Sequence, residues 1–266
     1  MVMKALFSAK ILVLPVLLAL AVAACSSGKR ASGSHVGLSS SAAEDYAPGQ
    51  LQQQVGKWSA AYQKRPDDKT TALSYAAVLR LNGQAGQAVA VLQRAVITHK
   101  NDREVASAYG KALAASGKFT EALNVIRNAN PAANPDWRLT SAEGAILDQI
   151  GENAAAKAKY TEALKIAPEE PTILSNLALS YVLSNDLAQA ESILRRAAAS
   201  PKANSKVRQN LALVLGLQGK FAEAEAVANN ELSRDQAAAN IAYLRSMLAQ
   251  PNTWNQIRGQ DKQNRS

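Results

Sequence analysis

The chain has 266 residues with 30 basic and 21 acidic side chains and a net charge of +9, a length that suffices for one or two ordinary domains. Its 5% aromatic residues, 14 glycines and 9 prolines argue against a β-sandwich, a collagen-like fibre and wholesale disorder. Cys25, His35 and His99 are its only cysteine and histidines. These are too few for a disulfide framework, and they make a Cys/His zinc site or a histidine-based hydrolase an unfavoured interpretation.

Residues 1–24 are typical of an export signal peptide. Lys4 and Lys10 come before an uncharged apolar run over residues 11–24, and this run is shorter than the roughly 20 residues that a membrane-spanning helix needs. The VAAC sequence that ends at Cys25 resembles the lipobox of bacterial lipoproteins, although valine stands where leucine is usual. The alternative is an ordinary signal peptide with a chance cysteine at its end.

The lipobox resemblance implies a lipid anchor on Cys25. A diacylglycerol and an N-acyl lipid would be its only bound groups, and no other cofactor is expected. Ser26 stands where enteric lipoproteins of the inner membrane carry aspartate, which favours the periplasmic face of the outer membrane. Residues 25–49 are rich in serine and glycine without a helical period, so we expect a flexible, lipidated tether.

Beyond residue 68 the sequence repeats every 34 residues in five blocks, which begin at Lys69, Arg103, Trp137, Pro171 and Ser205. The eighth place of the blocks is always small: Ala76, Gly110, Gly144, Ala178 and Ala212. The twentieth place is alanine in every block, and the fifteenth is Gly83, Gly117, Gly151, Asn185 and Gly219. Gly and Asn adopt a left-handed conformation at a helix end at least cost. Each block therefore predicts two antiparallel helices, over places 1–14 and 15–28, that come close at places 8 and 20.

This pattern resembles the tetratricopeptide repeat (TPR), which implies an all-α, right-handed solenoid of antiparallel helix pairs over residues 69–238. Residues 50–68 add a single helix ahead of it. Residues 235–250 add a capping helix, as solenoids require for solubility, and residues 251–266 with Trp254 form a loose tail. One face of the capping helix carries Ala237, Ile241, Leu244 and Leu248.

A TPR array by itself predicts an adaptor and not an enzyme, because such repeats build a concave binding surface and rarely perform chemistry. Glu143 takes a seventh place that is usually apolar, so we expect the third repeat to pack less well. Asp148 and Glu143 could suggest paired catalytic carboxylates. Their five-residue interval separates them by roughly 140° around one helix, so we interpret both as surface charges.

The stretches 134–151, 174–201, 207–228 and 238–254 resemble the TPR lipoproteins of tight-adherence (Tad, or Flp) pilus systems. This resemblance implies an outer-membrane lipoprotein needed for pilus assembly, a pilotin-like factor that helps the secretin ring reach or form in that membrane. The expected partners are a protein, namely the secretin or another assembly component, and the membrane through the lipid. Neither nucleic acid nor a small-molecule substrate is expected. The alternative is a general envelope scaffold that recruits cell-wall enzymes or assists outer-membrane protein assembly.

Places 2, 5, 9, 12 and 13 face the concave side in TPR arrays. The early repeats carry polar residues there, among them Thr70, Arg80, Glu104, Ser107, Lys111, Arg138, Ser141 and Gln149. The fourth and fifth repeats carry Leu179, Val182, Leu183, Leu213 and Leu217 there, with Ser175, Lys206 and Gln209 beside them. We call these five apolar side chains the apolar patch and expect it to bind an amphipathic helix of a client, such as a terminal segment of the secretin. Two alternatives stay open: some of these side chains turn inward, or the tail with Trp254 covers them.

The lipobox yields a direct test at Cys25. The change Cys25→Ser removes the only thiol that can receive the acyl chains, so we expect a folded TPR domain that no longer sediments with membranes. The measurement is fractionation of cells that carry either form, followed by immunoblotting. Wild-type protein found in the soluble periplasm would contradict the anchor, whereas wild-type protein in the inner membrane would contradict only the predicted sorting.

Overall fold

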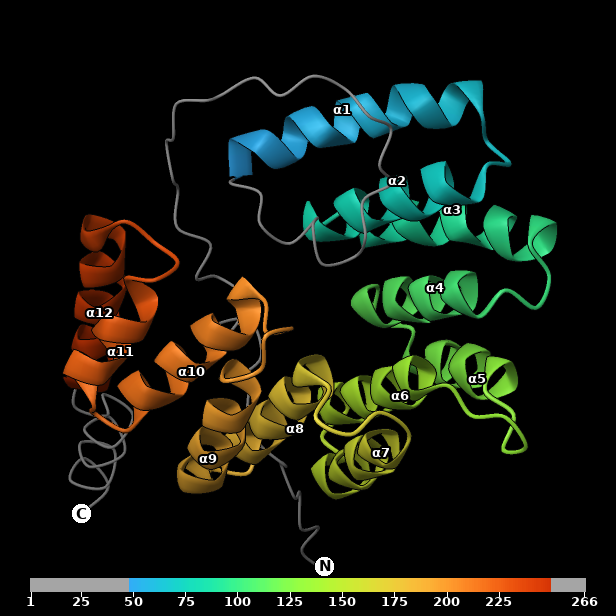
Figure 1. The fold of residues 1–266 in the computed structure, drawn as a ribbon. Helices are drawn as coiled ribbons and strands as arrows, with labels where there is room; N and C mark the ends of the chain where they lie inside the picture. Colours follow the sequence, from blue (N-terminus) through green and yellow to red (C-terminus); the bar gives the residue numbers. More distant parts are fainter. Residues whose placement is uncertain (1–47, 250–266) are drawn as a thin grey trace, which may run out of the picture.

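The structure is a computed structural model that describes residues 48–249, and every regular element in this range is an α-helix. Consecutive helices lie beside one another along a curved array from α1 to α12 (Figure 1). The predicted all-α solenoid of antiparallel helix pairs is therefore confirmed. The helices are α1 Pro48–Lys64, α2 Lys69–Leu81, α3 Ala85–Thr98, α4 Arg103–Ala115, α5 Phe119–Ala129, α6 Trp137–Gln149, α7 Asn153–Ile166, α8 Pro171–Leu183, α9 Leu187–Ala198, α10 Ser205–Leu217, α11 Phe221–Ala228 and α12 Arg234–Ala249.

The turn inside each pair has the same geometry five times. The backbone angle φ is 76°, 80°, 86° and 77° at Gly83, Gly117, Gly151 and Gly219, and 60° at Asn185, so the left-handed conformation predicted for place 15 is confirmed. The next residue donates its N–H to the carbonyl of place 11, for example Lys118 to Leu113 at 2.9 Å. This is the Schellman pattern that closes a helix end. The second helix begins at place 17 and not at place 15 as predicted, because the turn occupies the residues between.

The start of each first helix is also fixed by one column, place 34 of the preceding block. The side chains of Asp68, Asp102, Asp136 and Asn204 accept hydrogen bonds from backbone N–H groups of the first turn. These bonds satisfy donors that have no partner within the helix. Glu170 makes no such bond, and there Pro171, which has no N–H, takes the first helical position.

Small side chains occupy the places where the paired helices approach. The alanines of place 20 are fully buried in all five pairs. At Gly110 an added Cβ would lie 2.6 Å from the Ile126 side chain, and at Gly144 it would lie 2.8 Å from the Tyr160 ring. Ile126 and Tyr160 both take place 24 of the same pair, so the missing side chain at place 8 makes room for a large one at place 24.

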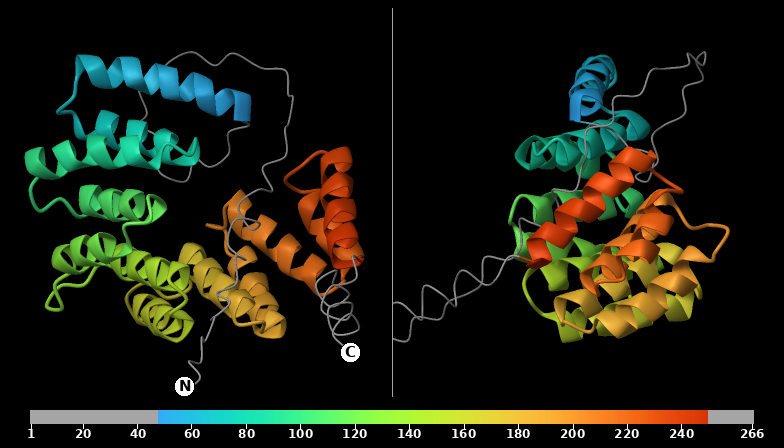
Figure 2. Two further views of the ribbon diagram at one scale, coloured as in Figure 1. Left: turned by 180° about the vertical axis from the view of Figure 1, so that it is seen from behind. Right: turned by 90° about the vertical axis from the view of Figure 1, so that its left-hand side faces the viewer.

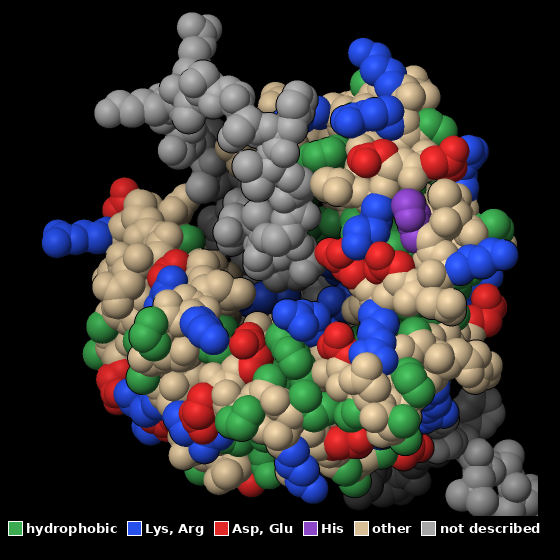
Figure 3. All heavy atoms as spheres, turned by 45° about the vertical axis from the view of Figure 1, so that its right-hand side comes forward, with side chains coloured by type: hydrophobic (Ala, Val, Ile, Leu, Met, Phe, Trp, Pro, Cys, Tyr) green, Lys and Arg blue, Asp and Glu red, His purple; other side chains and the backbone are tan. Residues whose placement is uncertain are grey.

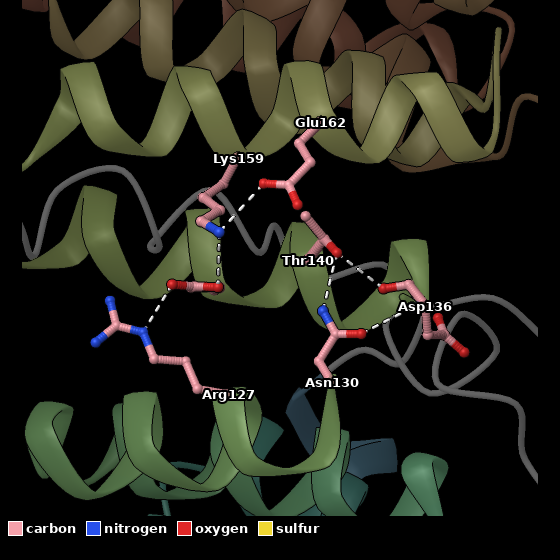
Figure 4. A network of polar contacts seen from close by, with 7 residues as sticks. Arg127, Asn130, Asp136, Thr140, Lys159 and Glu162 are labelled. Atoms are coloured by element: carbon pink, nitrogen blue, oxygen red, sulfur yellow. Dashed lines mark hydrogen bonds and ion pairs between the residues drawn. The ribbon is translucent and has the colours of Figure 1, made fainter. Parts of the chain in front are cut away.

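The prediction that Glu143 and Asp148 are surface charges is wrong. The Glu143 side chain is only 6% exposed, its Oε1 accepts from Arg127 Nε at 2.8 Å, and its Oε2 lies 3.4 Å from Lys159 Nζ. Figure 4 shows the side chains of Arg127, from α5, and Lys159, from α7, directed toward this carboxylate. Helices on both sides of α6 therefore cover Glu143, and a carboxylate is tolerated at this depth because two cations pair with it.

Asp148, the other carboxylate of α6, is half-buried and joins two repeats. It accepts hydrogen bonds from Tyr160 Oη at 3.0 Å, Ser180 Oγ at 2.7 Å and Asn153 Nδ2 at 2.8 Å. Burial raises the pKa of Tyr160, and the neighbouring carboxylate raises it further, so the phenol stays a neutral donor. Asp148 thus serves packing between α6, α7 and α8.

A second polar set joins the α5–α6 connection to the third repeat. Asn130 Nδ2 donates to Thr140 Oγ1 at 3.0 Å, and Asn130 Oδ1 accepts from the Asp136 backbone N–H at 2.7 Å (Figure 4). Thr140 Oγ1 also donates to the Asp136 carbonyl at 3.0 Å. Thr140 is buried where a bulky side chain is usual at place 4. Hydrogen bonds therefore replace apolar contacts at this position.

The two ends of the array are covered by single helices (Figure 2). Helix α1 buries Val55 and packs Trp58 and Tyr62 against the core beside α2. Helix α12 buries Ala237, Ile241 and Leu244. Leu248 was predicted on the same buried stripe, but it is 49% exposed, because it lies in the last turn of α12.

Several predictions fall on residues outside the described range: the signal peptide, the lipidated Cys25, the tether up to residue 47, and the tail with Trp254. Within residues 48–249 no helix has the length and apolar character needed to cross a membrane.

Place 20 supplies a test of the close approach. The change Ala190→Leu adds three carbons to a side chain that is fully buried between α8 and α9, so overpacking should cost about 1–3 kcal/mol of unfolding free energy. Neighbouring repeats are coupled, so the melting transition of the whole array should shift. Thermal unfolding followed by circular dichroism measures it.

The matched control is Gln189→Leu, at an exposed neighbouring position. It adds a similar side chain on the surface and should leave the melting temperature nearly unchanged. Equal shifts for the two variants would contradict the register of the repeat.

Candidate functional site

The first helices of the pairs, α2, α4, α6, α8 and α10, line one hollow of about 840 Å³ on the concave side of the array. We call it the concave hollow. Adjacent first helices contact one another from α2 to α10, so the lining continues from repeat to repeat. Its floor includes Ser107, Ser141 and Ser175, which all take place 5 and are all buried. Alanines such as Ala77, Ala108 and Ala145 lie beside them, together with larger apolar side chains such as Leu73, Leu139 and Ile146.

Asparagine side chains bond this floor across repeats. Asn176 Nδ2 donates to Ser141 Oγ at 3.2 Å, and Asn210 Nδ2 donates to Ser175 Oγ at 2.9 Å. Both asparagines take place 6, and both serines take place 5 of the preceding block. The same bond therefore fixes the α6–α8 and α8–α10 neighbours, and it leaves polar groups at the floor.

Charged side chains surround the floor. Figure 3 shows Lys and Arg side chains gathered in the hollowed part of this face, with acidic side chains around them. At the edge, Lys69 Nζ donates to Asp102 Oδ2 at 2.9 Å and lies 3.1 Å from Glu104 Oε2. These two contacts raise the pKa of Lys69. Burial alone would raise the pKa of Asp102, but the hydrogen bonds from Lys69 and from the first turn of α4 outweigh it and lower that pKa.

The structure separates the predicted site residues into two groups. Ser175 and Lys206 line the concave hollow, whereas none of the five side chains of the apolar patch is among its described lining residues. Leu179, Val182, Leu213 and Leu217 are half-buried and Leu183 is 38% exposed. Val182 packs against the core, and Gln209 Nε2 donates to Ser205 Oγ at 2.9 Å.

The two groups of residues lie at different positions along the same helices. The apolar patch lies at places 9, 12 and 13, toward the carboxyl ends of α8 and α10, whereas Ser175 and Lys206 lie nearer the amino ends. The helical period places all of these on one side of a helix but does not say how far along the helix a hollow extends. The apolar patch as a binding surface stays a prediction.

The polar residues that the sequence places on the concave side of the early repeats do line the hollow, apart from Thr70. They are Arg80, Glu104, Ser107, Lys111, Arg138, Ser141 and Gln149. Sequence reasoning missed Trp137 and Asn176, which also line it. They take places 1 and 6, which the TPR pattern does not assign to the concave side, so the repeat register alone does not identify them.

The described residues contain no group of three or more His, Cys, Asp or Glu side chains that could hold a metal ion. The lining of the concave hollow carries serine hydroxyls, amide groups and charged side chains beside apolar ones.

Comparisons with known proteins agree with this fold. The sequence profile of the tetratricopeptide repeat matches residues 171–196 and 208–229, which cover most of α8 to α11. No curated protein sequence matches the chain. A tetratricopeptide repeat protein from Parabacteroides merdae is similar with a TM-score of 0.59 and 11% identity, over 74% of this chain and 78% of that one.

Two further solved structures show the same likeness. TTC0263, a thermophilic TPR protein from Thermus thermophilus, has a TM-score of 0.54 and 21% identity, over 64% of this chain and 93% of that one. The APC/C hetero-tetramer Cut9–Hcn1 has a TM-score of 0.56 and 13% identity, over 78% of this chain. This chain spans only 41% of the matched chain of that complex. At these identities the likeness shows the fold alone: the chain contains TPR repeats and forms a TPR solenoid.

Proposed function

We propose that this protein is a lipid-anchored periplasmic adaptor that binds a protein partner on its concave side during assembly of Tad (Flp) pili. The concave hollow carries the adaptor part of the proposal. TPR arrays are protein-interaction scaffolds, and here five first helices line one hollow of about 840 Å³ with serine, asparagine and charged side chains beside apolar ones. A rigid surface that spans several repeats suits recognition of a polypeptide.

The pilus part of the proposal is supported by sequence resemblance. Residues 134–151, 174–201, 207–228 and 238–254 resemble TadD, the TPR lipoprotein of Tad systems. The VAAC sequence at Cys25 supports a diacylglycerol anchor, and Ser26 supports the periplasmic face of the outer membrane. A pilotin-like role fits both features, because the secretin must reach and assemble in that membrane. The partner in this proposal is the Tad secretin or another assembly component.

Deletion of the gene tests the pilus role. We expect the secretin to disappear from the outer membrane as a detergent-resistant multimer, because its localisation or assembly loses a factor. The measurement is membrane fractionation and immunoblotting of the secretin, with the deletion strain complemented by the wild-type gene as control. An unchanged secretin multimer together with normal pili would contradict the pilus role and favour a general envelope scaffold.

The apolar patch yields a separate test. The paired changes Leu179→Asp and Leu213→Asp place two charges on half-buried side chains of α8 and α10. If the patch binds the partner, secretin co-purification should be lost while helicity and melting temperature stay near those of the wild type. Circular dichroism and affinity purification measure the two quantities.

The matched control is Ala188→Asp with Ala222→Asp, which adds the same charge at exposed positions of α9 and α11. It should leave both binding and stability nearly unchanged. A Leu179 and Leu213 pair that unfolds the array would show that these side chains belong to the core. A Leu179→Asp, Leu213→Asp variant that still binds the secretin would also contradict the proposed binding patch.

A further inference from the structure

Positive charge exceeds negative charge among the described side chains that line the concave hollow. The basic side chains are Arg80, Arg103, Lys111, Arg138 and Lys206, and the acidic ones are Glu104 and Asp136. Glu104 Oε2 lies 3.1 Å from Lys69 Nζ, whose charge offsets it, and Asp136 Oδ1 accepts the Arg138 backbone N–H at 2.7 Å, a neutral donor that leaves the Asp136 charge in place. The five basic side chains still outnumber the two acidic ones. A hollow lined in this way attracts an anionic ligand.

Two of these arginines, Arg103 and Arg138, lie beside the amino ends of α4 and α6. Arg103 Nη2 donates to the backbone carbonyl of Asn134 at 2.7 Å, and this neutral acceptor orients the guanidinium without cancelling its charge. The Arg138 guanidinium lies 4.4 Å from the centre of the Trp137 ring. Stacking uses the face of a guanidinium and not its N–H edge, which is the part that binds carboxylates in a bidentate manner.

The floor of the hollow fits an extended chain better than a helix. Buried serines and Asn176 place hydroxyl and amide groups there, among alanines and larger apolar side chains such as Leu139. An extended segment exposes its backbone N–H and C=O groups, which need such polar partners, whereas a helix satisfies its own. An amphipathic helix would instead require an uninterrupted apolar groove, whereas here the serine of place 5 interrupts the apolar lining in three successive repeats. The serines and alanines of the floor also let a backbone come close.

From these observations we propose that the concave hollow binds an extended acidic segment of the partner protein. This inference rests on the proposed adaptor function and adds the chemistry of the ligand. Four spacings of about 8–10 Å between neighbouring packed helices give roughly 35 Å from α2 to α10. An extended segment of about ten to twelve residues spans that distance.

Peptide binding to the purified full-length lipoprotein in detergent tests the proposal. The probe is a fluorescein-labelled peptide of about twelve residues in which Glu alternates with Ser, a length set by the span above. Its counterpart carries Gln in place of every Glu. We expect the Glu peptide to bind about tenfold more tightly than the Gln peptide by fluorescence anisotropy, and added salt to weaken it. Equal binding of the two peptides, or no binding of the Glu peptide, would overturn the proposal.

Charge reversal in the hollow locates the binding. The pair Lys111→Glu and Arg138→Glu changes two exposed side chains of the lining, and it should weaken the Glu peptide by at least about tenfold. The control pair Lys100→Glu and Lys165→Glu makes the same change in net charge at positions outside the lining, and it should bind like the wild type. Equal losses in the two pairs would mean a general charge effect and would overturn the assignment.

Two further arms test the kind of ligand. A Glu peptide with proline at central positions cannot form a helix and should bind as well as the original; loss of its binding would overturn the extended conformation. A short oligothymidylate that bound as tightly through Lys111 and Arg138 would point to a general polyanion site and overturn the acidic polypeptide. If the reversal pair fails to fold, as shown by circular dichroism, Lys111→Gln with Arg138→Gln takes its place.

The test separates this proposal from the pilus role. It uses purified protein and synthetic peptides, so its result does not depend on the secretin. A deletion strain with normal secretin and normal peptide binding would contradict only the pilus role. A deletion strain without secretin multimers that is rescued by the Lys111 and Arg138 variant would contradict only the acidic ligand.

Discussion

The close approach of two helices within each pair is the constraint on which the rest of the structure depends. Where place 8 is glycine, place 24 holds Ile126 or Tyr160 directly over it. In the fifth pair, place 8 is Ala212 and place 24 is Ala228, both small, and Leu244 of the capping helix packs against Gly216 at place 12. In this pair the capping helix therefore supplies the large side chain that packs over a glycine. Because each pair keeps this spacing, successive pairs stack with one repeat length and form one continuous concave side.

The third repeat keeps this spacing with a charged core. Leu139, Ala142 and Ile146 of α6 pack into one apolar cluster, while Leu147 and Tyr160 pack into the next. Glu143, in the middle of α6, pairs with Arg127 on one side and Lys159 on the other. Buried ion pairs add little net stability, but they demand particular partners. We infer that these contacts fix how α5, α6 and α7 are placed relative to one another, where apolar side chains alone would allow sliding.

Most of the fold could be predicted from the sequence, because equivalent places of the 34-residue repeat carry the same type of residue. Gly or Asn at place 15 predicts a left-handed residue, and all five positions adopt it. The column at place 34 is likewise visible in the sequence, and the Asp and Asn residues in it are of the types that cap helices. The burial of Glu143 could not be predicted in this way, since it depends on the side chains of Arg127 in α5 and Lys159 in α7. Whether a charged side chain is buried depends on the helices packed around it, and the spacing of residues along one helix carries no information about those helices.

The candidate site could be predicted only in part. The helical period correctly places Arg80, Lys111 and Gln149 on the concave side. The point at which the hollow begins and ends along each helix is set by contacts between residues distant in sequence, such as Asn210 with Ser175.

The positions that line the hollow differ in how much they contribute to the fold. Places 5 and 6 hold serine and asparagine that bond one repeat to the next, so a change there alters the fold as well as the surface. Places 2, 9 and 12 supply Arg138, Lys111 and Arg80, whose side chains extend from helices that are already held by caps and small-residue contacts. We expect a change of charge at the exposed Lys111 and Arg138 to disturb the solenoid less than a change at the floor. Selection for a partner can therefore act on the outer places of the hollow while the floor keeps the repeats in register.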